Sequence, residues 1–412
     1  MEGKSDYGKK DIFLTLGLLI FILTIILMVY TNVFLRFYEV CHDSVNNLLA
    51  TLIQIEVVIL TVLISLSIAI IQLTVTSYSS RVAKIYQRDK WLLSITIIYI
   101  LIIIASLTYL KTSKISNQND KMIIILYGLG IFYLGIIPIY IYRLYEILKP
   151  EKIIDRVSKE IILKNILFED SDCVLLMIDF LRGSFIKHDY ESIERGLEKT
   201  RDRFKKAISK VSDEKKLLGV TKKIFKGLQS YCKFLLIQKD SEMILKTLKT
   251  FKKSAEFILN NEEVQGNLTD ENIDEAGKMI IEIFMSIANL AIRKKNEETI
   301  DKLNYYFEKL GKISIQKSLG NTLKEILLGY EEIWKQTRKK ELCDLSESEI
   351  SYITKLAELT IENQNFGLLK NISFYLENIA KYSIDNDYND DLEKSISSYK
   401  KIINLAVWRS GE

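Results

Sequence analysis

The sequence predicts an all-α protein in which a four-helix transmembrane bundle is followed by a cytoplasmic α-helical repeat domain of solenoid-like form. Four long apolar segments occupy the first third of the chain, while the remainder is rich in Lys and Glu at helical spacing. The second part also contains an internal repeat, the signature of stacked helical units. We therefore expect a transmembrane domain at residues 1–148 and a helical domain at residues 149–412.

Each of the four apolar segments is long enough to cross a bilayer, whose core needs about 20 apolar residues per helix. The segments lie at about residues 12–35, 48–76, 91–110 and 122–145. The first is too long for a signal peptide and has no small-residue cleavage site, so we expect it to remain as an anchor.

Cationic residues near the ends of the spans predict the orientation, because Lys and Arg collect on the cytoplasmic side. The N-terminal tail, the loop between the second and third spans, and the segment after the fourth span are rich in them. The opposite side carries Arg36, Lys111, Lys114 and Lys121. The bias predicts a multi-pass protein of the cell (cytoplasmic) membrane with both termini in the cytoplasm.

The second span carries a polar face, formed by residues that fall on one narrow arc of a helix at about 100° per residue. Its defining members are Gln54, Thr61, Ser65, Gln72 and Thr76. A second face of the same span carries Glu56, Ser67 and Thr74. Polar groups in hydrocarbon are costly without partners, so the first face should contact protein or water. Two interpretations stay open: it faces the interior of the bundle, or it lines a pore in a homo-oligomer.

The segment from Ser65 to Arg81 resembles an uncharacterised family of prokaryotic predicted membrane proteins, a domain of unknown function. That family has a Ser-x-Phe-Ser-Pro-Arg signature after a small-residue, Gln-containing helix. Here the segment ends in Thr-Ser-Tyr-Ser-Ser-Arg, with Tyr78 in place of Phe and Ser80 in place of Pro. The resemblance implies four N-terminal spans followed by a soluble region, and implies no activity.

Ser77, Ser79 and Arg81 follow the second span at its expected cytoplasmic end. An arginine there suits a lipid phosphate or the carbonyls at a helix C-terminus. Serine hydroxyls can bond the last carbonyls of the helix or donate to an anion. We weigh an anion contact at the membrane surface against simple anchoring of the helix end.

After Pro150, apolar residues at helical spacing predict an amphipathic helix, either lying on lipid or forming the first core helix of the next domain. Further on, two stretches match at a displacement of 69 residues. Leu290, Ile292, Asn296, Ile300, Leu303, Tyr306, Leu310 and Ile315 match Leu359, Ile361, Asn365, Leu369, Ile372, Tyr375, Ile379 and Ile384. An earlier copy begins at Leu235. The pattern predicts helix–turn–helix units of a solenoid, with an irregular bundle as the alternative.

The sequence offers no catalytic, cofactor or metal site. The four cysteines lie far apart, the two histidines lack metal-ligand spacing, and the acidic segment 385–391 lacks the Gly and Glu of an EF-hand. No phosphate-binding loop or nucleophile motif occurs. The net charge of +4, with both signs mixed along the chain, argues against a nucleic-acid partner.

Together these features predict a non-enzymatic protein: a scaffold or sensor anchored in the lipid bilayer that presents a helical-repeat surface to a cytoplasmic protein or peptide partner. The alternative is an oligomeric ion channel or small-solute transporter lined by the polar face of the second span.

Overall fold

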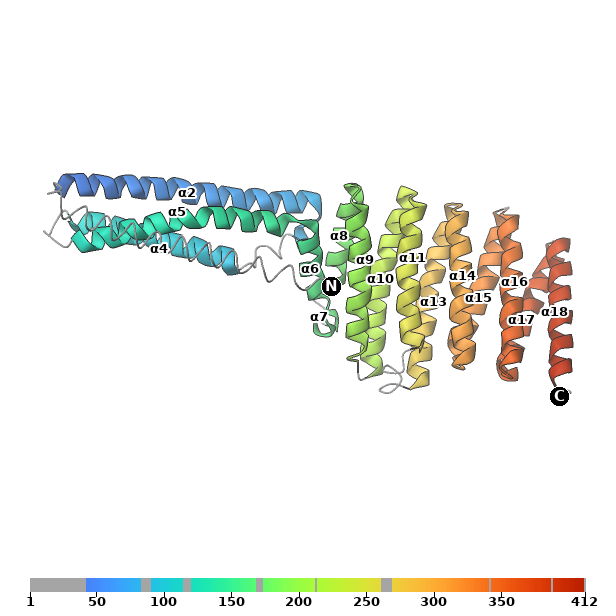
Figure 1. Cartoon of the computed structure of the whole chain (residues 1–412). Coiled ribbons are helices and arrows are strands. Elements are labelled where there is room, and N and C mark those ends of the chain that lie inside the picture. Colours follow the sequence, from blue (N-terminus) through green and yellow to red (C-terminus); the bar gives the residue numbers. More distant parts are fainter. Residues whose placement is uncertain are drawn as a thin grey trace. The chain divides into compact units, whose positions relative to one another are not determined.

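The computed structural model describes residues 42–82, 90–113, 120–167, 173–211, 213–260, 269–340, 342–386 and 388–410. Every regular element in these ranges is an α-helix. The chain divides into two compact units, Met1–Ile153 and Ile154–Glu412 (Figure 1). The first span expected from the sequence, at residues 12–35, lies outside the described residues.

The N-terminal unit contains three helices that pack against one another: α2 (His42–Ser77), α4 (Lys90–Ser113) and α5 (Asp120–Leu148). By length and composition, two described stretches are long and apolar enough to cross a membrane, Ala50–Ser77 and Gly128–Glu146. The apolar stretch of α4, Thr96–Lys111, is shorter. The all-α class is confirmed, and the four-helix transmembrane bundle stays a prediction.

Close approach of α2 and α5 shapes the interior of this unit. A Cβ on Gly130 of α5 would lie 2.4 Å from Glu56 Oε1 and 2.8 Å from Leu52 Cδ2, so only glycine fits there. Further along, the hydroxyls of Ser67 and Tyr140 are 2.6 Å apart and share a hydrogen bond. Glycine at a helix crossing is the usual means of bringing two apolar helices together.

Helix α6 (Pro150–Glu160) runs across the boundary into the C-terminal unit, which continues with α7 (Leu163–Leu167) and a two-layer array of helices. The first layer contains α8 (Cys173–Ile186), α10 (Glu214–Gln238), α13 (Asp270–Arg293), α15 (Gly320–Lys339) and α17 (Phe366–Asp385). The second contains α9 (Tyr190–Ile208), α11 (Ser241–Asn260), α14 (Glu297–Gln316), α16 (Cys343–Glu362) and α18 (Asn389–Ser410). Each helix contacts its neighbours within its own layer, and successive hairpins stack side by side (Figure 1). This is a helical-repeat fold.

The two interpretations of the segment after Pro150 predict different burial of its apolar side chains. Ile154 and Val157 of α6 are buried, as is Ile153 at the boundary between the units. Burial of this apolar face favours a core helix over a helix lying on lipid.

The repeat has a period that the sequence comparison did not find. Helices α14 to α18 begin at residues 297, 320, 343, 366 and 389, each 23 residues after the last, so a hairpin recurs every 46 residues. The displacement of 69 residues therefore spans three helices. At this displacement, the turn between α13 and α14 aligns with the turn between α16 and α17. The first turn leads from the first layer to the second, and the other leads from the second layer back to the first. The repeat unit assigned from that displacement is thus wrong, although helix–turn–helix units do form.

The turns explain why the displaced stretches matched. A residue in the left-handed region is followed by a side chain that caps the next helix, in turns of both directions. At one turn Lys295 has φ 53° and Asn296 accepts from Thr299 N–H at 3.0 Å; at another Gln364 has φ 55° and Asn365 accepts from Leu368 N–H. The two stretches match because their turns share the same kind of capping residues. These residues do not indicate to which layer a helix belongs.

One turn lacks its own cap and takes it from the neighbouring hairpin. Leu319 precedes α15 and has no capping side chain. Asp274 of α13 instead accepts from the backbone N–H groups of Asn321 and Thr322, at 2.8 and 2.7 Å. The Thr322 hydroxyl also donates to this carboxylate, at 2.7 Å. A carboxylate at a helix N-terminus is favourable, so this contact ties adjacent repeats together.

A chain of aromatic rings runs through the core of the array, crossing from layer to layer. Successive ring centroids lie 5.3 to 6.1 Å apart. Its members are Phe204, Phe225, Phe251, Phe284, Phe307, Tyr330 and Tyr352. Buried aromatic pairs at such distances contribute beyond their burial, so this spine joins the hairpins into one core.

Candidate functional site

The described residues provide no cluster for local chemistry. Among them, no group of three or more His, Cys, Asp or Glu side chains is placed to hold a metal ion. Cys173 and Cys232 are buried free thiols. In the acidic segment 385–391, Asp391 lies in the first turn of α18, is buried and forms an ion pair with Arg338 of α15. That segment therefore has a structural contact within the array.

The polar face of α2 points away from the helices that pack on α2. All five side chains predicted to define this face are exposed: Gln54, Thr61, Ser65, Gln72 and Thr76. The described helices α4 and α5 therefore do not cover this face, and the interpretation that it faces the bundle interior stays a prediction, because the first span lies outside the described residues. The hydroxyls of Thr61 and Thr76 donate to backbone carbonyls of their own helix, at 2.9 and 3.0 Å. The pore interpretation stays a prediction.

The other polar face of α2 is the one that points inward. Glu56 and Thr74 are buried, and Ser67 bonds Tyr140 of α5. The physical reason lies on α5, because Gly130 and Tyr140 determine which side of α2 this helix can approach. Nothing in the sequence of α2 alone distinguishes its two polar faces.

The segment after α2 provides a helix cap. Ser77 is the last residue of α2 and is half-buried. Ser79 Oγ accepts a hydrogen bond from Val82 N–H at 3.3 Å, so Ser79 caps the helical segment that begins at Ser80. Arg81 is exposed beside this cap. The predicted anion contact of these residues stays a prediction.

The open end of the array presents a surface that sequence analysis missed. Four apolar or aromatic residues of α18 have exposed fractions between 38% and 65%: Ile396, Tyr399, Ile403 and Val407. At the same places in α16, 46 residues earlier, the chain buries Ile350, Ile353, Ala357 and Ile361. In α14 it buries Asn304, Phe307, Gly311 and Ile315. In α14, Asn304 and Gly311 lie against Glu349 and Leu356 of the next second-layer helix, whereas no described helix covers these places in α18. We call the α18 residues the terminal face.

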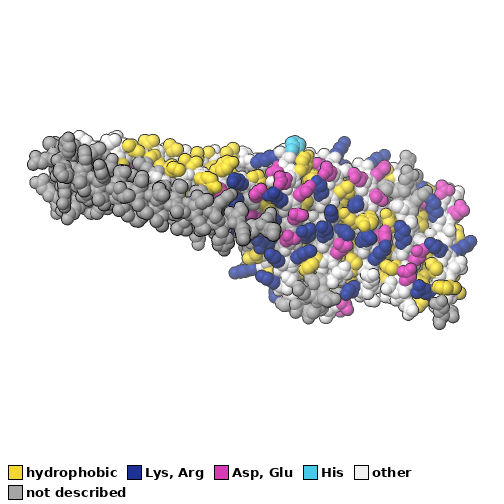
Figure 2. Space-filling model, viewed as in Figure 1, with side chains coloured by type: hydrophobic (Ala, Val, Ile, Leu, Met, Phe, Trp, Pro, Cys, Tyr) yellow, Lys and Arg dark blue, Asp and Glu magenta, His cyan; other side chains and the backbone are white. Residues whose placement is uncertain are grey.

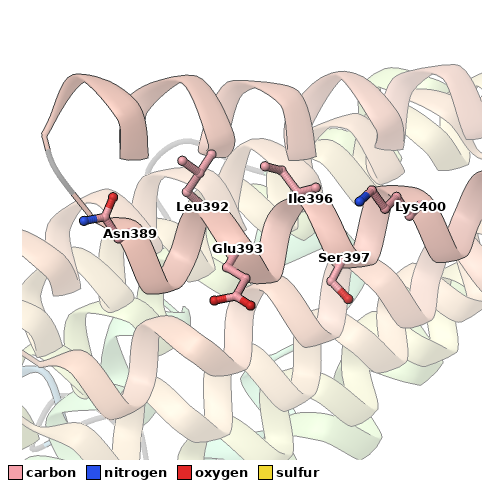
Figure 3. A pocket seen from close by; sticks show the side chains of 6 residues that line it. All are labelled: Asn389, Leu392, Glu393, Ile396, Ser397 and Lys400. Atoms are coloured by element: carbon pink, nitrogen blue, oxygen red, sulfur yellow. The ribbon is translucent and has the colours of Figure 1, made fainter.

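Charged side chains lie among the apolar residues of this face. An open pocket of about 380 Å³ on α18 is lined by Asn389, Leu392, Glu393, Ile396, Ser397 and Lys400. Figure 3 shows these residues following one another along the helix. Glu393 precedes Ile396 by three residues and Lys400 follows it by four, so one negative and one positive charge flank the apolar centre. Elsewhere on the visible side of the array, cations and anions are interspersed (Figure 2).

A buried acid lies between α14 and α16. Glu349 is fully buried, and Asn304 Nδ2 donates to its Oε1 at 2.8 Å. Burial raises the pKa of Glu349 to about 8, while the hydrogen bond from Asn304 opposes that shift. The carboxyl group therefore stays protonated inside the array at neutral pH.

No protein-family model matches the chain, and no curated protein matches it. Among solved structures, a circular tandem repeat protein with novel repeat topology matches at 13% identity and a TM-score of 0.29, over 85% of this chain and 98% of its own. A de novo designed helical repeat protein matches at 14% identity and a TM-score of 0.28, over 64% of this chain and 100% of its own.

Proposed function

We propose that this chain is a membrane-anchored interaction scaffold or sensor whose cytoplasmic helical array binds a protein or peptide partner. The observation that carries the proposal is the two-layer array of stacked hairpins with an exposed apolar terminal face. Stacked helical repeats present extended surfaces, and their ends normally carry a polar outer face for solubility. An end without that polar face is typical of an interaction site.

Membrane anchoring rests on the surface of the N-terminal unit. Val58, Val62 and Leu73 of α2 have exposed fractions of 62%, 56% and 57%. Apolar side chains are prominent on the visible side of this helix (Figure 2). A surface of this kind matches lipid, and the apolar stretches of α2 and α5 have the length that a bilayer requires. The cationic residues near the span ends support the cytoplasmic side for both termini.

Thiol labelling of intact cells tests the topology. In the wild-type chain, Cys41 lies in the loop that the sequence places outside, so we expect a membrane-impermeant maleimide to label it. A Lys324→Cys variant in a Cys41→Ser background puts the thiol at an exposed position of α15. We expect that thiol to react only after the cells are lysed. Labelling of the Lys324→Cys variant in intact cells, above the level of the Cys41→Ser background, would contradict the proposed topology.

Photo-crosslinking in the native membrane tests the scaffold. A photoreactive residue replaces the exposed Phe374 of α17 or the exposed Ile403 of α18, with the exposed Lys324 as the matched control position. We expect adducts with a second protein species at one or both apolar positions and none at the control. If mass spectrometry finds no second protein species at either position, the scaffold proposal is wrong.

An oligomeric channel or small-solute transporter is the second candidate, favoured by the exposure of the polar face of α2. No described helix of a single chain covers this face, and exposed Gln54 and Gln72 would be costly in lipid. Several copies arranged around a water path would satisfy them. Flux measurements in liposomes test this: Gln72→Leu should abolish flux, while Leu73→Ala, at the next exposed residue on a different face, should leave it intact. No flux from the wild-type protein would contradict the channel.

A further inference from the structure

We infer that the interior of the N-terminal unit contains a proton-binding site at Glu56, where the carboxyl group is held in its neutral, protonated form. The inference goes beyond the proposed function, because it assigns a ligand to the membrane unit and does not depend on any partner of the helical array. It rests on the burial of Glu56, on its contact with α5 and on the buried groups that α4 brings to the same interior.

Glu56 of α2 is a buried acid within an apolar stretch of helix. Its exposed fraction is 1%. Neither of its carboxylate oxygens has a hydrogen-bond partner among the described residues. A buried carboxylate anion without a partner is far more costly than the neutral acid, and binding of a proton removes the charge. Ionisable groups at such positions in membrane helices commonly take part in proton binding.

The contact with α5 excludes water from one side of the carboxyl group. A Cβ on Gly130 of α5 would clash with Glu56 Oε1 and with Leu52 Cδ2, so the glycine backbone lies directly against this oxygen. Water can solvate a buried charge only where a polar cavity has room for it. The packing of α5 on α2 leaves no such room beside Gly130. Hydration therefore does not stabilise an anion on that side.

Helix α4 brings a buried hydroxyl group to the level of Glu56. Tyr109 and Leu110, near the end of α4, pack against the cluster that contains Leu52 of α2. The short connection from α2 to α4 makes the two helices antiparallel, so one turn from this cluster leads to Glu56 on α2 and to Ser106 on α4. Ser106 is fully buried, and its hydroxyl has no hydrogen-bond partner among the described residues.

The titratable groups around Glu56 are phenols of α4. Tyr99 is buried, lies seven residues before Ser106 on the same face of α4, and interacts electrostatically with Glu56. Tyr109 is the other tyrosine that α4 places against α2. On α5 the neighbour of Glu56 is Gly130, which has no titratable side chain. These hydroxyl groups can bond a protonated carboxyl group, and they supply no positive charge to balance an anion.

A bound proton at Glu56 affects the packing of the two helices. Loss of the proton would place a negative charge directly against the backbone of Gly130. An anion there gains stability when water reaches it, which requires α5 to move away from α2 at this contact. Proton binding at Glu56 and close packing of α5 on α2 therefore favour each other.

A hydrophobic carbodiimide tests for the proton, because reagents of this kind react with protonated carboxyl groups in apolar surroundings. The full-length chain is reconstituted in nanodiscs, treated with dicyclohexylcarbodiimide at neutral and at alkaline pH, and analysed by mass spectrometry after digestion. We expect an adduct on Glu56 at neutral pH and loss of this adduct at alkaline pH. Glu362, exposed on α16 of the same chain, is the matched control and should stay unmodified at both.

Infrared spectroscopy provides a second readout, which does not depend on access of the reagent. A protonated carboxyl group has a carbonyl stretching band distinct from that of a carboxylate. Subtracting the spectrum of Glu56→Gln separates Glu56 from Glu349 of the array, whose pKa is also raised by burial. We expect the protonated band of Glu56 at neutral pH and its loss at alkaline pH. Glu56→Gln has the shape of the neutral acid, so its thermal unfolding at neutral pH should match the wild type.

The outcomes separate this inference from the proposed function. A carboxylate band of Glu56 at neutral pH would overturn the inference. Protection of Glu56 from the carbodiimide by added sodium or potassium ions at constant pH would also overturn it, because a metal cation would then be the occupant. Either result would leave the scaffold in place, since photo-crosslinking from the array does not involve Glu56.

Discussion

The two units of this protein differ in the side chains that they leave exposed. In the N-terminal unit, Glu56 and Thr74 of α2 are buried while Val58 and Leu73 are exposed. In the C-terminal unit, the rings from Phe204 to Tyr330 are fully buried, and charged side chains are spread over the visible side of the surface (Figure 2). Burial of apolar area drives folding in water, so the second unit has the arrangement of a water-soluble domain. The apolar side chains exposed on the first unit match the lipid environment that we propose for it.

The comparison also shows how each unit achieves close helix packing. In the N-terminal unit Gly130 lets α5 approach α2. In the array Gly277 of α13 lies against Thr322 of α15. The array adds polar ties between repeats, since Asp274 caps the start of α15. Tight glycine contacts thus bring helices together in both units, and in the second unit a carboxylate of one repeat also caps the start of α15 in the next.

The largest expected effect tests whether the interior of the array excludes water. Because the pKa of Glu349 is raised to about 8 in the folded chain, the folded state keeps this proton up to that pH, while the unfolded state loses it above the ordinary pKa of 4.5. The stabilising contribution is therefore full below pH 4.5 and is lost as pH rises from 4.5 to about 8, by on the order of a few kcal/mol.

Denaturant unfolding of the full chain, followed by the fluorescence of the buried Trp334, measures this dependence. Glu349→Gln should remove most of the pH dependence in that window and keep the hydrogen bond with Asn304. Glu362→Gln, at an exposed glutamate of the same helix, is the control. An unchanged pH profile in Glu349→Gln would show that water reaches the carboxyl group.

The second effect tests whether the surfaces of the two units face different environments, with a matched pair of exposed apolar residues. Val62 of α2 and Ile237 of α10 have similar exposed fractions, 56% and 61%. In lipid, a lysine near the centre of a span costs about 3 kcal/mol, whereas a surface substitution in water costs within about 0.5 kcal/mol. We expect Val62→Lys to reduce the membrane-inserted fraction strongly and Ile237→Lys to leave insertion and stability unchanged.

Carbonate extraction of membranes measures the inserted fraction, and thermal unfolding measures the stability of the array. Equal tolerance of lysine at both positions would show that the surface of the first unit faces water. That result would remove the difference between the two units.

The third effect concerns the glycine contact within the array. A Cβ on Gly277 would lie 2.2 Å from Thr322 Oγ1 and 3.1 Å from Leu259 Cδ2. Gly277→Ala should displace Thr322 from Asp274 and cost about 2 kcal/mol in the free energy of unfolding. Gly367→Ala is the control, since its nearest contact is Asn365 Oδ1 at 3.8 Å. Equal stability of the two variants would mean that α13 and α15 can separate freely.

Much of the fold follows from local sequence signals. Apolar runs predicted spans at 48–76, 91–110 and 122–145, and the structure has α2, α4 and α5 over these residues. The period of 23 residues was hidden, because the buried places hold different residues in each helix. The ring chain keeps that period from Phe284 to Tyr330 and loses it in the earlier hairpins, whose helices and turns differ in length.

The terminal face could not be predicted for a related reason. Ile396, Tyr399, Ile403 and Val407 have the spacing of an ordinary core helix, so α18 resembles its predecessors in sequence. They are exposed because no helix among the described residues packs on this side of α18. The burial of α2 was difficult to predict for a similar reason. This helix has two polar faces, and its contacts with α5 determine which of them is buried.

The smallest expected effect concerns the turns of the array, whose positions were predicted well from the sequence. Asn296 accepts from Thr299 N–H at 3.0 Å and donates to Ser241 Oγ at 3.2 Å, so it caps α14 and contacts the preceding hairpin. Asn296→Ala should lower the free energy of unfolding by about 1 kcal/mol. Asn321→Ala, at an exposed asparagine in the first turn of α15, should change it by less than half of that amount. Because Asp274 caps α15 from another helix through backbone N–H groups, that end does not depend on the Asn321 side chain. Equal losses of unfolding free energy in Asn296→Ala and Asn321→Ala would mean that a helix capped within its own turn and a helix capped from another repeat depend equally on these side chains.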